Sequence, residues 1–144
     1  MSVKRLELMM AIKWNNSLWK DIENAARSGI EAGTMIVQNE MYRLILETPK
    51  TGKTRLSGRG DGSLHQASAP GEPFASDTGN ALSRIKNRSM NRGLSKRIYS
   101  TLDYQAYLEL GTSRMAARPV FVPAVKNKEK EVVDVVVRKI KAVL

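Results

Sequence analysis

The sequence contains no cysteine and a single histidine, His65. The absence of cysteine excludes disulfide frameworks, thiolate zinc sites and cysteine nucleophiles, and it is typical of a reducing compartment. One imidazole also leaves few ways to build a catalytic or metal-binding set. We therefore expect the chain to use no cofactor and to have no enzyme activity.

Long apolar runs are missing as well. Near the N-terminus, Lys4, Arg5, Glu7 and Lys13 interrupt the apolar residues, and no small-residue cleavage site follows them. The sequence therefore predicts neither an export signal nor a membrane span. A length of 144 residues suits one domain, residues 1–144, with a modest core.

Acidic residues are scarce in the middle of a chain whose net charge is +10. Residues 1–48 carry six basic and six acidic residues, residues 49–100 carry ten and three, and residues 101–144 carry eight and five. The middle third should attract polyanions, nucleic acid above all, through charge rather than sequence. A merely solvated basic surface is the alternative. The candidates to face DNA are Lys53, Arg55, Arg84, Lys86, Arg88, Arg92, Lys96 and Arg97.

Helical periodicity marks both ends of the chain. Over residues 18–45 the apolar residues recur in steps of three and four, which predicts a helix capped by one of residues 15–17 and ending near Thr48, before Pro49. At about 45 Å it would be longer than a compact domain needs, so we expect part of its face to serve a neighbouring subunit. Pro123 suits the first turn of a last helix. The predicted apolar stripe of that helix comprises Val125, Val132, Val133, Val136, Ile140 and Val143.

Residues 50–80 are rich in glycine and proline and have few large apolar side chains. This composition predicts a loop or extended arm, which in so short a chain is usually functional or disordered. Complete ordering of this arm would require something to pack against it.

Two strands are predicted beyond the arm, at residues 83–90 and 94–102, around a turn at residues 91–93. For the first strand there is an alternative, since Asp77 or Thr78 could cap a short helix through Ile85. The residues predicted to be buried in the strands are Ile85, Leu94, Ile98 and Leu102.

A short helix is predicted next, at residues 104–110, with Asp103 as its N-cap and Gly111 as its left-handed C-terminal cap. Residues 117–121 should be extended, because Pro119 disfavours helix at the preceding residue. The predicted fold is of the α+β class: a long N-terminal helix and a C-terminal helix pack on a small antiparallel β-sheet, with a projecting arm.

Two sequence patterns contain part, but not all, of a known nucleotide-binding or metal-binding site. Residues 47–54 resemble a P-loop, but they follow a predicted helix where a P-loop would follow a strand. Asp61, His65 and Asp77 could hold a metal for a nuclease, although nothing in their spacing requires it. A lone histidine in a polar loop is more often simply solvated, so we expect neither a nucleotide site nor a metal site.

The most specific pattern lies in residues 104–124, Tyr-Gln-Ala-Tyr-Leu-Glu-Leu-Gly-Thr-Ser-Arg-Met-Ala-Ala-Arg-Pro-Val-Phe-Val-Pro-Ala. Its Leu-Glu-x-Gly-Thr stretch, followed by a short loop and Ala-Arg-Pro-x-x-x-Pro-Ala, resembles the signature of the head-to-tail joining proteins of lambda-like tailed double-stranded DNA phages, the neck, tail-completion or minor tail components. Residues 65–85, with Ser-Ala-Pro-Gly-Glu-Pro and Asp-Thr-Gly-Asn, resemble a loop of the same family.

The resemblance implies a structural subunit of a ring, hexameric in the family, located in the virion after assembly in the host cytoplasm. Its partners would be other copies of itself and the neighbouring connector and tail-tube proteins, and double-stranded DNA would pass through the lumen without sequence recognition. The assembly motif would comprise Tyr104, Tyr107, Glu109, Gly111, Thr112, Arg118, Pro119 and Pro123. The subunit-contact arm would comprise His65, Ser68, Pro70, Gly71, Pro73, Thr78 and Gly79.

The residues of this motif also have a structural interpretation. We expect Glu109 to lie near Arg114 and Arg118 for a charge-assisted hydrogen bond, and Pro119 to fix an extended segment. A non-specific nucleic-acid-binding module is the alternative function for the chain as a whole.

Overall fold

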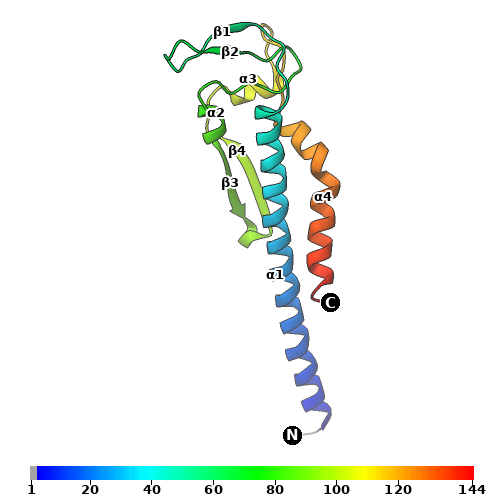
Figure 1. The fold of residues 1–144 in the computed structure, drawn as a ribbon. Coiled ribbons are helices and arrows are strands. Elements are labelled where there is room, and N and C mark those ends of the chain that lie inside the picture. Colours follow the sequence, from blue (N-terminus) through cyan, green and yellow to red (C-terminus); the bar gives the residue numbers. More distant parts are fainter. Residues whose placement is uncertain (1–2) are drawn as a thin grey trace.

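The computed structural model describes the backbone of residues 3–144 and the side chains from Asn16 onward. Its longest element is helix α1 (Val3–Leu46), beside which the C-terminal helix α4 (Phe121–Lys141) runs antiparallel (Figure 1). Together with two small antiparallel two-stranded sheets, these helices confirm the predicted α+β class. The elements between the two helices are β1 (Thr54–Leu56), β2 (Leu64–Gln66), α2 (Asn80–Ser83), β3 (Ile85–Met90), the 3-10 turn η1 (Asn91–Gly93), β4 (Ser95–Ser100) and α3 (Gln105–Leu110).

Helix α1 begins earlier than the sequence predicted. Its 44 residues span about 66 Å at 1.5 Å per residue. The predicted caps at residues 15–17 lie inside the helix, because no glycine or proline interrupts the segment before them. The C-terminal end was predicted closely: the helix stops at Leu46, and the ammonium group of Lys50 donates a 2.9 Å hydrogen bond to the carbonyl oxygen of Leu44.

Two glycines let α1 and α4 approach closely. A Cβ atom on Gly29 would lie 2.9 Å from Val136 Cα, and one on Gly33 would lie 2.8 Å from Val132 Cγ1. In Figure 1 the pairing ends where α4 ends, and α1 continues well beyond it toward the N-terminus.

The apolar stripe of α4 is narrower than predicted. Val132, Val136 and Ile140 are half-buried, but Val125 and Val133 are 52% and 54% exposed. Val143, beyond the end of the helix, is 38% exposed. The stripe therefore follows steps of four residues along the single face that meets α1.

The core lies at the C-terminal end of α1, where α4 begins. Val120 and Ala124 are completely buried there, and Met41 of α1 is 1% exposed. The other members of this buried apolar cluster are Val37, Leu44, Ile45, Phe74, Ala81 and Ile85. Phe74 belongs to the segment predicted as an arm, so that segment supplies a core residue.

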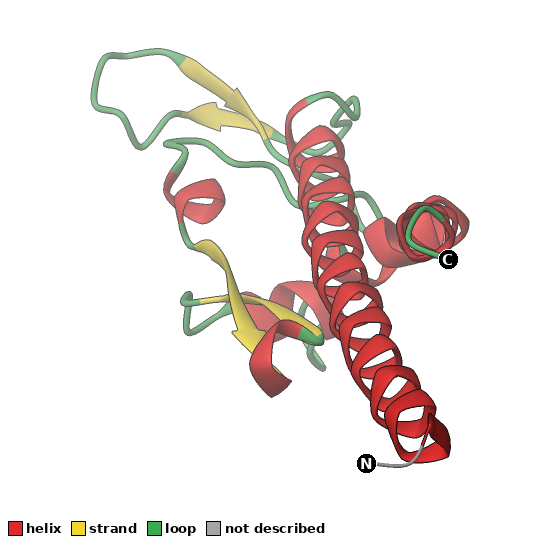
Figure 2. Ribbon diagram, turned by 90° about the horizontal axis from the view of Figure 1, so that it is seen from below, coloured by secondary structure: helices red, strands yellow, loops and turns green. Residues whose placement is uncertain are grey.

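The predicted hairpin of β3 and β4 is confirmed, with Ile85 paired to Ser100 and Met90 paired to Ser95. Ile85 is buried, and Ile98 and Leu102 pack against the core. Leu94 was predicted to be buried but is 42% exposed, because it lies in the turn at the tip of the hairpin. Figure 2 shows this hairpin and α4 on opposite sides of α1.

Both interpretations of the residues before β3 are partly correct. The one-turn helix α2 precedes the strand, but its N-cap residue is Gly79, whose φ is 80°. The Thr78 hydroxyl accepts a long, 3.4 Å hydrogen bond from the Asn80 amide at the helix start, but Asp77 does not cap the helix. Asp103 does not cap α3 either, since the N-cap residue is Tyr104 and no side chain bonds the helix start. Of the segment predicted to be extended, residues 117–120 are non-helical, but Phe121 already begins α4, and Pro123 lies in its first turn.

Within the described residues, no helix has both the length and the apolar character that crossing a membrane would require.

Candidate binding cleft at the base of the arm

The part of the arm that projects is a small hairpin formed by β1 and β2. Arg55 pairs with His65 in its register, and these two residues share the face that turns toward the rest of the molecule. On the opposite face Leu56 pairs with Leu64, and both side chains are exposed, by 70% and 71%. The hairpin therefore presents basic residues inward and an apolar pair outward.

Residues 67–79 pack against the molecule and hold the hairpin in place. The carboxylate of Glu72 accepts hydrogen bonds from the Thr51 amide (3.0 Å), the Thr51 hydroxyl (2.5 Å) and the Ala69 amide (2.7 Å). These donors hold the pKa of the Glu72 carboxyl below its usual value. The Gly71 amide donates a 2.9 Å bond to the Ala117 carbonyl oxygen.

Asp77 makes the second attachment. Its carboxylate accepts hydrogen bonds from the Ser57 hydroxyl (2.5 Å) and the Gly58 amide (2.8 Å), and its carbonyl oxygen accepts one from the Arg59 guanidinium (2.9 Å). The Ser57 hydroxyl, together with the Gly58 amide, holds the pKa of the Asp77 carboxyl below its usual value. The arm is thus fixed at its base and at its turn by carboxylates that come from its own returning segment.

The Gly-Thr segment that follows α3 forms a tight turn. Gly111 ends the helix with φ 75° and ψ −179°, a backbone conformation that is almost exclusive to glycine. The predicted left-handed cap is therefore correct in its positive φ but wrong in ψ, which is extended. A Cβ atom there would lie 2.8 Å from both Ala117 N and Met115 O. The hydroxyl of Thr112 then accepts bonds from the amides of Arg114 (3.2 Å) and Met115 (3.1 Å).

Glu109 has a different partner from the one predicted. Its carboxylate accepts hydrogen bonds from three backbone amides at the start of α4: those of Val120 (2.8 Å), Phe121 (3.1 Å) and Val122 (2.8 Å). Arg118, one of its predicted partners, instead donates to the carbonyl oxygen of Ser68 at 3.2 Å. The interaction is stronger than a surface ion pair, because amides at a helix N-terminus have no partner within the helix.

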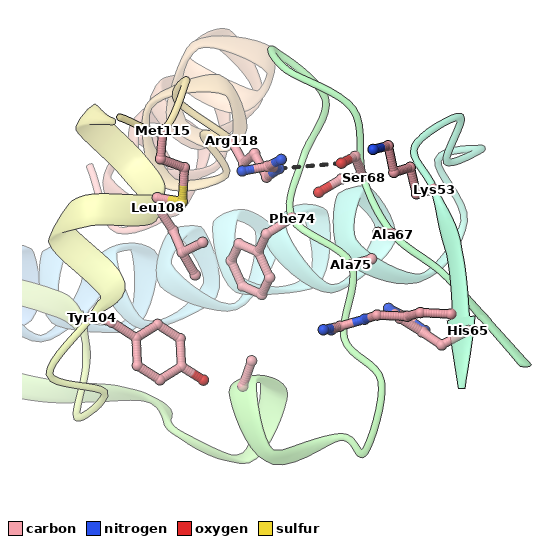
Figure 3. A pocket seen from close by; sticks show the side chains of 12 residues that line it. Lys53, His65, Ala67, Ser68, Phe74, Ala75, Tyr104, Leu108, Met115 and Arg118 are labelled. Carbon is pink, nitrogen blue, oxygen red and sulfur yellow. Dashed lines mark hydrogen bonds between the residues drawn. The ribbon is translucent and has the colours of Figure 1, made fainter. Parts of the chain in front are cut away.

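A cleft of about 430 Å³ opens between the arm and α3 (Figure 3). Its apolar wall includes Phe74, Leu108 and Met115, with Tyr104 at one end and Lys53 at the other. The residues lining it are Lys53, Arg55, His65, Ala67, Ser68, Phe74, Ala75, Ala81, Tyr104, Leu108, Met115 and Arg118. The lining contains three permanent cations and a histidine but no carboxylate.

The cleft contains one histidine, His65. The acid closest to its histidine is Asp77, whose Oδ1 lies 3.8 Å from His65 Nδ1 but is already bonded to Ser57. Asp61, the third residue of the nuclease hypothesis, accepts a bond from the Ser63 amide in the hairpin turn. Among the described residues, no three histidine, aspartate or glutamate side chains come together as they would around a metal ion. With three cations and an apolar wall, the arrangement can hold an anionic group or a group that is part anionic and part apolar.

The structure brings together residues that the sequence placed in separate groups. Tyr104 and Arg118 of the predicted assembly motif meet His65 and Ser68 of the predicted subunit-contact arm. The remaining arm residues are distributed along the surface: Pro70, Gly71 and Thr78 are exposed, and Pro73 and Gly79 are half-buried. Ser68 is only 6% exposed and is therefore unsuited to a neighbour's contact, a correction to its predicted role.

The residues expected to face DNA also separate. Lys53 and Arg55 line the cleft, and the guanidinium of Arg84 bonds the Asn80 side chain at 3.4 Å. Lys96 turns toward α1 and forms an ion pair with Glu31, so it does not face outward as predicted. The exposed Leu56–Leu64 pair and buried Phe74 were missed, because each depends on contacts that the local pattern does not encode.

Comparisons with known proteins return no relative. The chain matches no protein-family model, and no curated protein or solved structure is detectably similar to it. The resemblance to head-to-tail joining proteins therefore rests on the two sequence segments themselves.

Proposed function

We propose that this chain is a structural subunit of a ring at the junction between the head and tail of a double-stranded DNA phage. The ring, hexameric by resemblance, would join a connector protein on one side to tail-tube proteins on the other while DNA passes through it. The proposal covers neck, tail-completion and tail-terminator subunits alike. It assigns the chain no catalytic activity, no cofactor and a place in the virion.

The observation that carries the proposal is the fixed arm with its outward apolar pair. Single exposed leucines are ordinary on protein surfaces. Here Leu56 and Leu64 are paired on a projecting hairpin that Glu72 and Asp77 hold in place, so the pair is presented in one orientation. Preorganised apolar side chains of this kind are typical anchors of protein interfaces, since little conformational entropy is lost when they bind.

An apolar groove elsewhere on the same chain is our candidate to receive this pair. This groove, of about 340 Å³, lies between α1, α4 and β4, and Val37, Phe121 and Val125 are among its lining residues. A contact between the arm of one copy and the groove of the next joins two different patches, which is the kind of contact that closes rings. The arm and the groove together support a ring built from one type of subunit.

The test is the oligomeric state of the purified chain, measured by native mass spectrometry and sedimentation. The parent should form a closed oligomer, and the double variant Leu56→Ser, Leu64→Ser should be monomeric. Val125→Glu, in the groove, should also be monomeric. Val133→Glu is the matched control, because Val133 lies on the same helix at nearly equal exposure (54% against 52%) but outside the groove.

A parent that stays monomeric up to its solubility limit would contradict the ring. If Val125→Glu and Val133→Glu both assembled like the parent, the ring would be retained, but the groove would not be part of its subunit interface.

A further inference from the structure

The segment that contains the β3–β4 hairpin carries charge of one sign only. No acidic residue occurs between Asp77 and Asp103, whereas six basic residues do. An uncompensated block of this size is unusual next to a core, because like charges on one short hairpin repel one another. The basic residues are Arg84, Lys86, Arg88, Arg92, Lys96 and Arg97.

Strand alternation sorts these residues between two faces. The inner face meets α1: Asn87 donates a 2.9 Å bond to Gln38, and Lys96 forms its ion pair with Glu31. The basic residue on this face is therefore neutralised within the chain.

The outer face has no such compensation. Lys86 is paired with Tyr99, and Arg88 lies directly opposite Arg97. All three cations are exposed, and within residues 16–144 none of their side chains has a hydrogen bond or an ion pair. Cβ atoms of directly opposed residues in such a ladder lie about 5 Å apart, so Arg88 and Arg97 repel each other until an anion is present.

The turn adds a fourth cation at the tip. Asn91 and Arg92 both have positive φ values, 48° and 55°, and Gly93 follows at 88°. The Asn91 side chain donates to the Ser95 hydroxyl at 3.0 Å, which fixes the turn. Arg92 is exposed there, and its side chain has no hydrogen bond or ion pair among the described residues. Its left-handed conformation is one that a branched or bulky residue adopts only at some cost.

From this surface we infer that the outer face of the β3–β4 hairpin binds the phosphate backbone of double-stranded nucleic acid. Guanidinium groups bind phosphate through two parallel N–H bonds, and a tyrosine hydroxyl such as that of Tyr99 is a common further donor. Side chains on one face of a strand recur about every 6.8 Å, while each nucleic-acid strand carries a phosphate per about 3.4 Å of helix rise.

The mode of contact follows from the inner face. A free two-stranded ribbon can enter the major groove, but here α1 covers the inner face of the hairpin. The hairpin should therefore lie across phosphates and bind without base recognition. This inference does not rest on the ring, since a monomer presents the same face.

Duplex binding should be measured by fluorescence anisotropy with several unrelated 20-base-pair sequences between 50 and 200 mM salt. Four phosphate contacts predict a slope of about −3.6 in log K against log salt, which is a loss of roughly 150-fold over that range. The variant Lys86→Gln, Arg88→Gln, Arg97→Gln should retain a slope of about −0.9 and lose only about three- to fourfold. All sequences should bind alike.

The control removes the same charge elsewhere. Lys126, Lys130 and Lys141 are exposed on α4, and their joint replacement by glutamine changes the net charge by the same three units. This control should keep most of the parent's slope. Equal losses in the two triple variants would overturn the inference, because binding would then reflect net charge alone.

Two further measurements keep the test sharp. The melting temperature of the triple hairpin variant should be no lower than that of the parent, since the variant relieves the repulsion between Arg88 and Arg97. If it is lower, the single variant Arg97→Gln should still reduce the slope of log K against log salt by about 0.9 without loss of stability. The second measurement is the binding of the parent and the hairpin variant to vesicles that contain phosphatidylserine. Hairpin-dependent binding to these vesicles without binding to duplex would refute the nucleic-acid assignment, and strong preference for one duplex sequence would refute the backbone mode.

Discussion

Replacing Glu109 tests the interaction that attaches α3 to α4. The Glu109→Ala variant removes a carboxylate that accepts three amide hydrogen bonds at the start of α4. The amide of Val120, a fully buried residue, and the amide of half-buried Phe121 share one oxygen. Val122 is half exposed, so water can replace its bond.

The magnitude follows from those two shielded bonds. A hydrogen bond to a charged group contributes about 1.5–3 kcal/mol, and a negative charge at a helix N-terminus adds about 0.3–1 kcal/mol. With the two bonds sharing one acceptor, we expect Glu109→Ala to lower the free energy of unfolding by about 3–4 kcal/mol. At roughly 3–5 °C per kcal/mol for a chain of this size, the melting temperature should fall by about 10–15 °C.

Glu109→Gln separates the charge from the hydrogen bonds. Its amide oxygen can occupy the position that serves both Val120 and Phe121, so the cost should be smaller, about 1–2 kcal/mol. Urea denaturation followed by circular dichroism at constant m-value gives both numbers, with Glu129→Ala on the exposed part of α4 as the control. A Glu109→Ala variant within about 0.5 kcal/mol of the parent would refute the reasoning, because ordinary surface changes stay within that range.

Three other expectations concern packing, backbone conformation and pH, and a fourth concerns the arm. Gly33→Val should destabilise the α1–α4 contact by more than Gly33→Ala, since even one added carbon meets Val132 at 2.8 Å, and thermal melts of both variants check the order. Gly111→Val should cost more than about 1 kcal/mol because its backbone conformation is nearly exclusive to glycine; a parental melting curve would contradict this. The hydrogen bond from the Arg43 side chain lowers the pKa of Glu40 to about 2. The ionised Glu40 carboxylate therefore stabilises the fold fully above about pH 4.5, and this contribution is lost as the pH falls toward 2. The difference in urea midpoint between the parent and Glu40→Gln should shrink over that interval. Hydrogen exchange should show the amides of residues 67–79 protected even in a monomer, and equal exchange across the whole arm would mean that its attachments open readily.

The features that sequence predicted well are those with local causes. Pro49 and Pro123 bound their helices, and a glycine with positive φ occurs at position 111, because each of these depends on the backbone of one or two residues. The β3–β4 hairpin was predictable for the same reason, since its turn lies between two strands that pair directly. The start of α1 was wrong because a good cap residue is optional wherever a helix can continue through it.

The cleft could not be predicted in the same way. Glu109 bonds amides 11 to 13 positions away, whereas its predicted partners Arg114 and Arg118 are five and nine positions away. Phe74 reaches the core from a segment with little other apolar content. Such contacts depend on where the chain returns in space. The sequence pattern identified which segments matter but not that the arm and the motif after α3 form one surface.

The two completely buried residues at the entry to α4 have a consequence for folding order. The buried cluster around Met41 on α1 is complete only when Val120 and Ala124 arrive, roughly 80 positions later in the chain. During synthesis, α1 and the arm therefore remain partly structured until residues 120–124 emerge, and the core then forms in one cooperative step. A chain halted before residue 120 would expose part of the apolar face of α1 to chaperones or to aggregation, while one released a few residues past Ala124 would already contain every member of the buried cluster described above.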